Sequence, residues 1–294
     1  MSWQNWISLL GIAPVLIMLG LLLWQKRRMD ADQRREAITT ELRNLPASSL
    51  QKRRDDFVER QVSRLMAAAI IGMSTVGIFF SRRVSAAVFS WDLLDAIGLL
   101  TIIGCGLYYG LLMIREMPHG RKLRQAIRAE QAVAQELAAS LAGDNRIIHD
   151  IQASEFNIDH VVITPVGVFA VETKSRLKPP AGNGSPRVKY DGKQLAFPGW
   201  TETKPIEQAA RQAKWLADYL QKATGERLPV FAVLALPGWF IDYSVRMTEQ
   251  MVRVINPKNS GWLLLPGKQP IRLDPPAIQR AAFQIEKLAQ VTPE

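Results

Sequence analysis

Three apolar segments in the first 115 residues limit how this chain can fold. Residues 3–24 carry no charged side chain and are followed by the basic residues 26–28, KRR. About 20 consecutive apolar residues suffice for a helix to cross a bilayer, so the segment predicts a transmembrane helix. Because no basic stretch precedes it and no small-residue cleavage site follows it, we expect a retained anchor and not a removed signal peptide.

Two further segments extend this expected membrane region. Residues 65–80 are apolar but short, and residues 91–114 form a longer run that ends before Arg115. The shorter segment is also compatible with a buried or interfacial helix. We therefore expect an all-α membrane region over residues 1–118, with two to three transmembrane helices.

Basic residues in the loops predict the orientation of these helices. Residues 25–64 contain eleven Lys and Arg and seven Asp and Glu, and residues 115–128 contain five Lys and Arg and one Glu. Cytoplasmic loops are enriched in Lys and Arg, and three spans place both segments inside, with the N-terminus outside. The pattern predicts a multi-pass protein of the bacterial inner (cytoplasmic) membrane whose C-terminal domain is cytoplasmic. The charged loop 25–64 is then expected to contact anionic lipid of the bilayer.

Residues 119–294 have the pattern of a separate α/β domain. Helical periodicity covers residues 120–142, 205–223 and 275–290. Expected strands are residues 146–151, 160–164, 167–173 and 228–236, weaker strands near 251–255 and 261–265, and a hairpin across 187–197 around Asp191-Gly192. This order of helix, three strands, helix and strand predicts a mixed sheet with flanking helices.

The composition excludes some kinds of site and favours some partners. The single cysteine, Cys105, allows neither a disulfide framework nor a cysteine zinc site. The three histidines, His119, His149 and His160, are scattered along the sequence and do not indicate zinc. A net charge of +10 and a pI near 9.9 favour an anionic partner, such as nucleic acid or lipid headgroups.

The segment at residues 156–175, FNIDHVVITPVGVFAVETKS, places two acids and a lysine at the outer ends of an apolar hairpin. Asp159 lies near the start of the first apolar run, and Glu172 and Lys174 close the second. Carboxylates that face each other repel unless a cation lies between them, and Mg²⁺ or Mn²⁺ binds carboxylate oxygens. The pattern indicates metal-assisted hydrolysis of a phosphodiester, in which the lysine stabilises charge on the phosphate. A structural Asp–Lys–Glu ion cluster is the alternative.

The turn of this hairpin decides whether the two acids meet. If it centres on Pro165-Val166, Thr164 pairs with Gly167, and the same register places Asp159 opposite Glu172. Opposed Cβ atoms are about 4.5–5.5 Å apart. A bulge at Gly167 would shift the pairing by one residue and rotate the acids away from each other.

Five short motifs resemble the nuclease-related domain (NERD) family. They are residues 129–130 (AE), 157–161 (NIDHV), 167–174 (GVFAVETK), 204–205 (KP) and Gln208. The resemblance covers about residues 120–240. The family is regarded as a branch of the PD-(D/E)xK superfamily, so the resemblance implies a restriction-endonuclease-like fold and an Mg²⁺-dependent (or Mn²⁺-dependent) endonuclease that acts on DNA.

The resemblance also implies a role for each matched residue. Asp159 and Glu172 would be the metal ligands, and Lys174 would be the catalytic lysine. Glu130 would be the helix acid that approaches the metal, and Gln208 would be the glutamine of the next helix. Glu130 could instead be an ordinary solvated acid, with Glu136 as a rival, and Gln208 could face solvent.

Basic residues follow the proposed site closely in sequence. They are Arg176, Lys178, Arg187, Lys189 and Lys193. They are expected to form a rim that contacts nucleic-acid phosphates, although a solvated or lipid-facing loop has the same composition.

The sequence therefore predicts a membrane-anchored, metal-dependent nuclease with its catalytic domain in the cytoplasm. One alternative is a catalytically inactive, membrane-tethered nucleic-acid-binding or scaffold module. Another is a structural envelope protein whose basic loops bind lipid. The sequence does not fix the oligomeric state.

Overall fold

The computed structural model describes residues 45–83, 92–139, 145–153, 155–179, 186–259 and 270–289, together with Trp24 and Arg27. The chain divides into two compact units, residues 1–41 with 54–121 and residues 42–53 with 122–294. Nearly all of the expected first span, residues 3–24, and the expected strand near 261–265 lie outside the described residues.

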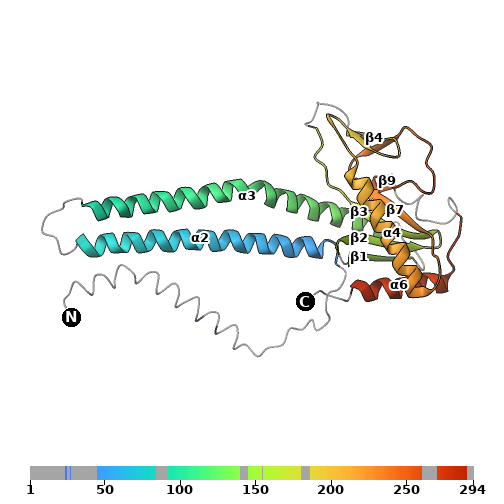
Figure 1. Cartoon of the computed structure of the whole chain (residues 1–294), viewed down its shortest axis with the longest axis horizontal. Coiled ribbons are helices and arrows are strands. Elements are labelled where there is room, and N and C mark those ends of the chain that lie inside the picture. Colours follow the sequence, from blue (N-terminus) through green and yellow to red (C-terminus); the bar gives the residue numbers. More distant parts are fainter. Residues whose placement is uncertain are drawn as a thin grey trace. The chain divides into compact units, whose positions relative to one another are not determined.

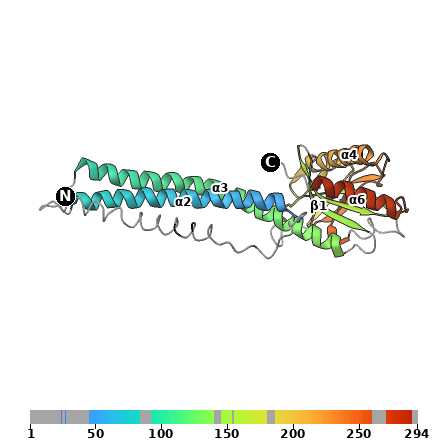
Figure 2. The ribbon, with the colours of Figure 1, turned by 90° about the horizontal axis from the view of Figure 1, so that it is seen from below.

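Two long helices are α2 (Ser48–Arg83) and α3 (Leu93–Ala139). Residues 54–83 of α2 and 93–121 of α3 supply most of the described part of the first unit. They lie side by side there (Figures 1 and 2), where the Gln61 amide and the Arg64 guanidinium donate to the Glu116 carboxylate at 2.5 and 2.6 Å. By length and composition both helices are candidate membrane spans, and their apolar stretches are almost entirely unburied. They contain the expected segments at 65–80 and 91–114, the latter from Leu93 onward.

Helix α3 joins two segments that the sequence pattern separates. The pattern predicts helices at 91–114 and 120–142, whereas α3 continues through Pro118. A proline inside a helix removes one backbone hydrogen bond, but Phe57 of α2 packs at this point. A Cβ on Gly120 would lie 2.7 Å from Phe57 Cε1, and the Phe57 and His119 ring centroids are 5.6 Å apart. Glycine thus permits the close packing that supports the helix beside the proline.

A five-stranded mixed sheet, in the order β1-β2-β3-β7-β9, forms the centre of the second unit. The strands are β1 (Arg146–Gln152), β2 (Asn157–Thr164), β3 (Gly167–Thr173), β7 (Val230–Ala235) and β9 (Arg253–Ile255). The first three pair antiparallel, whereas β3, β7 and β9 run parallel. The expected α/β class with a mixed sheet is confirmed, because strands are found at each of these predicted places.

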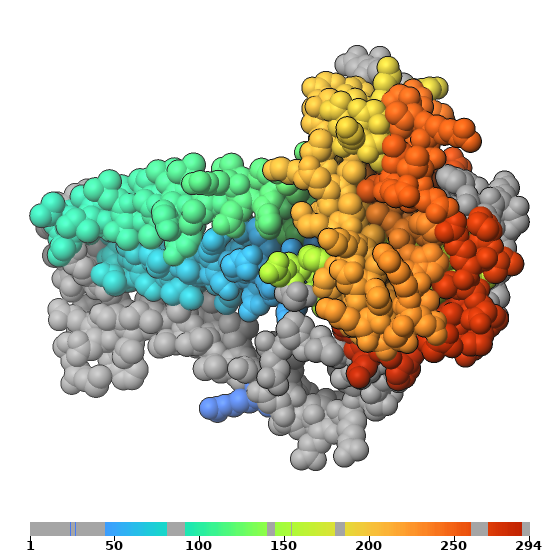
Figure 3. Space-filling model, turned by 45° about the vertical axis from the view of Figure 1, so that its right-hand side comes forward, coloured from blue at the N-terminus to red at the C-terminus, as the bar shows by residue number. Residues whose placement is uncertain are grey.

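Helices cover both faces of this sheet. Helix α4 (Lys204–Thr224) and helix α6 (Pro275–Ala289) pack on one face, where Leu216 and Ile278 belong to one apolar core. Figure 2 shows both helices on that side of β1, and Figure 3 shows the red α6 against the orange surface. The Tyr219 hydroxyl of α4 donates to the Gln284 carbonyl of α6 at 3.1 Å. Val133 and Leu137 of α3 cover the other face.

A second, four-stranded sheet has the order β6-β5-β4-β8. Its strands are β4 (Arg187–Tyr190), β5 (Leu195–Phe197), β6 (Trp200–Glu202) and β8 (Phe240–Tyr243). The expected hairpin around Asp191-Gly192 is confirmed by the pairing of β4 with β5. Strands β6 and β8 and the short 3-10 helix η1 (Pro257–Asn259) have no counterpart in the sequence prediction.

Candidate functional site

The β2–β3 hairpin has the register that the sequence predicts. Thr164 pairs with Gly167 and His160 pairs with Val171, and continuing by one residue places Asp159 opposite Glu172. A Cβ at position 167 would lie 2.7 Å from the Phe231 ring and 3.0 Å from the Pro229 carbonyl oxygen. Glycine is therefore required by the close approach of β7, and there is no bulge that would separate the acids.

Asp159 is a buried acid near the start of β2. Its side chain is 7% exposed, and Oδ2 accepts a hydrogen bond from the backbone N–H of Thr173 at 2.6 Å. Burial, followed by the charges of Glu172 and Glu130, raises the pKa of Asp159 well above its usual range, while the Thr173 N–H and Lys174 lower it. Burial among other acids thus favours the protonated form of Asp159.

Glu172 lies near the end of β3, beside the parallel end of β7. One carboxylate oxygen pairs with the Lys174 ammonium. The other accepts a hydrogen bond from the Gln212 side chain of α4 at 2.5 Å, and the same amide group donates to the Asn157 carbonyl at 3.0 Å. These contacts from strand and helix fix the orientation of the Glu172 carboxylate.

Glu130 enters the site from α3. It is 6% exposed, and its Oε2 has no hydrogen-bond partner within the part of the chain that the structure describes. Burial, then the charges of Asp150 and Glu172, raises the pKa of Glu130 to about 8, and Lys174 opposes the rise. Glu130 is thus a buried acid directed at the site, and the alternative of a solvated helix acid is not what the structure shows.

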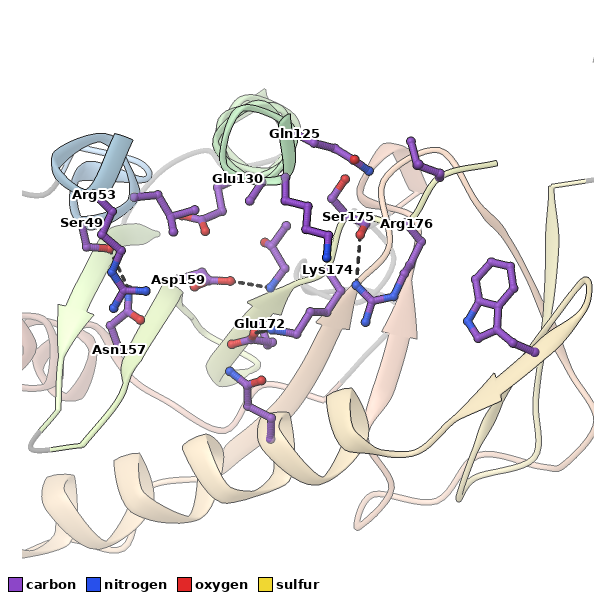
Figure 4. Close-up of a pocket in the computed structure, with 17 residues that line it drawn as sticks. Ser49, Arg53, Gln125, Glu130, Asn157, Asp159, Glu172, Lys174, Ser175 and Arg176 are labelled. Carbon is purple, nitrogen blue, oxygen red and sulfur yellow. Dashed lines mark hydrogen bonds and ion pairs between the residues drawn. The ribbon is translucent and has the colours of Figure 1, made fainter. Parts of the chain in front are cut away.

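These acids and Lys174 line one open pocket with a volume of about 760 Å³. Figure 4 shows Glu130 above, with Asp159 and Glu172 below it and Lys174 beside Glu172. The pocket lies at the carboxyl ends of parallel β3 and β7, where open α/β sheets commonly bind ligands. Three buried carboxyl groups and Lys174 therefore share a space that a ligand can enter.

The donor chemistry of this pocket fits a hard divalent cation. Mg²⁺ is usually held by one or two carboxylates and several waters, and an unpartnered buried Glu130 oxygen and a buried Asp159 both favour added positive charge. Among the described residues, no group of three or more His, Cys, Asp or Glu side chains is arranged to hold a metal directly.

The glutamine that reaches the acids is Gln212. Gln208 is half-buried and lines the pocket, but the hydrogen bond to Glu172 comes from Gln212, one helical turn later. The sequence did contain an indication that Gln212 has a buried partner, because Gln212 lies in the apolar stripe of α4 with Ala209 and Leu216. A polar residue at such a core position needs a buried partner.

The expected basic rim is only partly at the pocket. Arg176 lines it and makes two hydrogen bonds of 2.8 Å to the Glu202 carboxylate. The other four residues, Lys178, Arg187, Lys189 and Lys193, are not among the described residues that line this pocket. Arg187 instead lies over the Phe240 ring, 4.5 Å from its centroid.

Two histidines that are distant in sequence meet across β1 and β2. His149 pairs with His160, and their Nδ1 atoms are 2.8 Å apart. Burial lowers the pKa of His160 to about 3, so the pair is neutral. These two histidines therefore lie together although they are 11 positions apart in the sequence, and the described residues form no group of three or more possible metal ligands around them.

Comparisons with known proteins identify the segment that carries this site. A family model described as nuclease-related domain, NERD, matches residues 125–237. The resemblance expected from the sequence is confirmed over these residues, which include Glu130, Asp159, Glu172 and Lys174. Comparisons with curated proteins and with solved structures found no match.

Proposed function

We propose that the second unit is a metal-dependent nuclease that hydrolyses phosphodiester bonds, with DNA as its expected substrate. The observation that carries the proposal is the meeting of Asp159, Glu172 and Lys174 in one open pocket within the matched nuclease-related domain. The volume of about 760 Å³ is in the usual range for small-ligand sites.

Asp159 and Glu172 would hold Mg²⁺ or Mn²⁺ in this pocket. When bound, such an ion neutralises charge on the phosphodiester and makes a water molecule more acidic. The Thr173 N–H orients Asp159, and Gln212 orients Glu172. Both contacts restrict side-chain motion, which favours the fixed geometry that hydrolysis needs.

Lys174 and Glu130 have complementary roles in this proposal. The Lys174 side chain is about one quarter exposed, so its ammonium group could reach a phosphate oxygen and stabilise the charge that develops there. Glu130 holds a proton near neutral pH in the absence of a cation, because its pKa is about 8. It can release this proton when positive charge enters the pocket.

We also propose that the N-terminal region anchors the nuclease unit in the membrane, as the sequence predicts. Helices α2 and α3 are candidate spans, and their basic flanks favour a cytoplasmic location for the nuclease unit. The anchoring, the inner-membrane location and the orientation are all part of the proposal. Cleavage at the membrane surface would then restrict the enzyme to nucleic acid that approaches the bilayer.

The experiment is cleavage of plasmid and single-stranded DNA by the full chain in detergent, with Mg²⁺ and with EDTA. The full chain is needed because residues 42–53 belong to the second unit. Lys174→Ala should abolish the metal-dependent cleavage, whereas Lys178→Ala is the matched control. Metal-independent binding without cleavage would instead support a tethered nucleic-acid-binding module.

A further inference from the structure

The first turn of α2 is docked on the second unit through Asp150. This buried β1 residue has a φ of 51°, a conformation that Asp tolerates better than most residues. Its Oδ2 accepts a hydrogen bond from the Ser49 N–H at 2.6 Å and another from the Ser48 hydroxyl. A carboxylate at the start of a helix satisfies free N–H groups and stabilises the helix dipole.

A chain of hydrogen bonds connects this docking point to the candidate catalytic acids. The Asn157 side-chain amide donates to Asp150 Oδ1 at 2.6 Å and to the Ser49 hydroxyl at 3.2 Å. The Asn157 carbonyl accepts from Gln212, which also donates to Glu172. The start of α2 is thus held in register with the site by groups that also orient Glu172.

Docking brings Arg53 to the pocket. Arg53 follows Ser49 by four residues, so both side chains lie on one face of α2, and both line the pocket. Figure 4 shows Ser49 and Arg53 on one side of the acids and Arg176 on the other. On α3, Lys122 lines the same pocket eight residues before Glu130. Both added basic residues precede the matched segment 125–237.

The side chains of Arg53 and Lys122 are available to a ligand. Lys174 is paired with Glu172, and Arg176 is paired with Glu202. Arg53 and Lys122 are exposed, and neither forms an ion pair with the rest of the described chain. An extended polyanion that crosses the acids between Arg53 and Arg176 would have its flanking phosphates beside these groups.

We propose that Arg53 and Lys122 bind phosphates of the nucleic-acid substrate, so that the start of α2 completes the substrate site of the nuclease unit. The inference rests on the proposed function, since it assigns the substrate contacts of the same pocket. Asp150 is a positioning residue that places Arg53. The residues that continue into the candidate membrane helices are therefore part of substrate binding.

The test is the salt dependence of DNA binding by the full chain in detergent. Fluorescence anisotropy of a labelled duplex in EDTA measures binding without cleavage over a KCl series. Each phosphate contact contributes about 0.9 to the slope of log K against log salt. Arg53→Ala/Lys122→Ala should lower this slope by about 1.8 and weaken binding at low salt on the order of tenfold or more. Lys52→Ala/Arg124→Ala removes the same charge from exposed neighbours that do not line the pocket.

The outcomes separate this inference from the proposed function. If the wild-type chain binds and cleaves DNA but the double variant matches the control variant, only the inference is overturned. If the wild-type chain neither binds nor cleaves DNA, both are overturned. Soluble dihexanoyl-phosphatidylglycerol is the second probe. Loss of its binding in Arg53→Ala/Lys122→Ala, with DNA binding unchanged, would overturn the inference in favour of lipid contact.

Discussion

Replacing Glu130 by Gln should remove a specific pH dependence of stability. The folded-state pKa of Glu130 is about 8, against an ordinary value of 4.5. Between these values the folded protein keeps a proton that the unfolded chain has lost, so stability falls as pH rises. Each pKa unit corresponds to about 1.4 kcal/mol, so ionisation of this acid in the unfolded chain lowers the free energy of unfolding by about 5 kcal/mol by pH 8.

The assay is thermal unfolding of the full chain in detergent and EDTA between pH 5 and pH 9. A change of about 5 kcal/mol shifts the midpoint by about 10 °C or more for a unit of this size. Glu130→Gln resembles the protonated acid, so its midpoint should match the wild type near pH 5 and exceed it above pH 8. Glu136→Gln on the same helix is the control.

The two buried histidines do not obscure this comparison. Burial lowers the pKa of His149 and His160, so their contribution to stability increases as pH rises toward 6.5. That contribution is common to the wild type and Glu130→Gln and cancels in the difference. Parallel midpoint curves for the two proteins across pH 5 to 9 would refute the claim that Glu130 is buried among uncompensated acids.

Three further predictions follow from the contacts in the site. Gln212→Ala should lower the single-turnover rate of DNA cleavage by about one to two orders of magnitude, because Glu172 would lose the contact that orients it. Gln208→Ala should have a smaller effect, and equal losses in the two variants would contradict this prediction. When Asp150→Asn is already present, adding Arg53→Ala should no longer change the slope of log K for DNA binding against log salt. A change of about 1 in this slope would show that Asp150 does not position Arg53. Mn²⁺ binding measured by electron paramagnetic resonance should be lost in Glu172→Gln, and unchanged binding would place the cation elsewhere.

The core of the site was predictable because its contacts are local. A two-residue turn and strand alternation fix which residues face each other, so Asp159, Glu172 and Lys174 could be placed by counting from Thr164 and Gly167. The structure confirms that register. The strands β1, β2 and β3 were likewise expected from short apolar runs.

The contacts that the sequence did not predict depend on packing between segments that are distant in the chain. Gln208 and Gln212 lie on similar faces of α4, and only the position of the helix on the sheet decides which one reaches Glu172. The docking of Ser49 on Asp150 joins residues about 100 positions apart. Asp150 also has a positive φ, which no sequence pattern signalled.

The basic rim was placed by nearness in sequence, which is a weak guide across a loop. Of the five predicted residues, Arg176 alone lines the described pocket. Arg187 and Lys189 belong to β4, whose register in the second sheet depends on the later strand β8. Basic residues that follow a site closely in the sequence therefore indicate the class of partner better than they indicate which residues contact it.

We propose that the buried acids of this pocket form a metal-dependent nuclease centre. The most direct measurement is the rate of DNA cleavage by the full chain in Mg²⁺, in EDTA and with Asp159→Asn. We expect cleavage by the wild type in Mg²⁺ only and none by the variant. Metal-dependent cleavage by Asp159→Asn at the wild-type rate, or wild-type cleavage that EDTA does not reduce, would contradict the account.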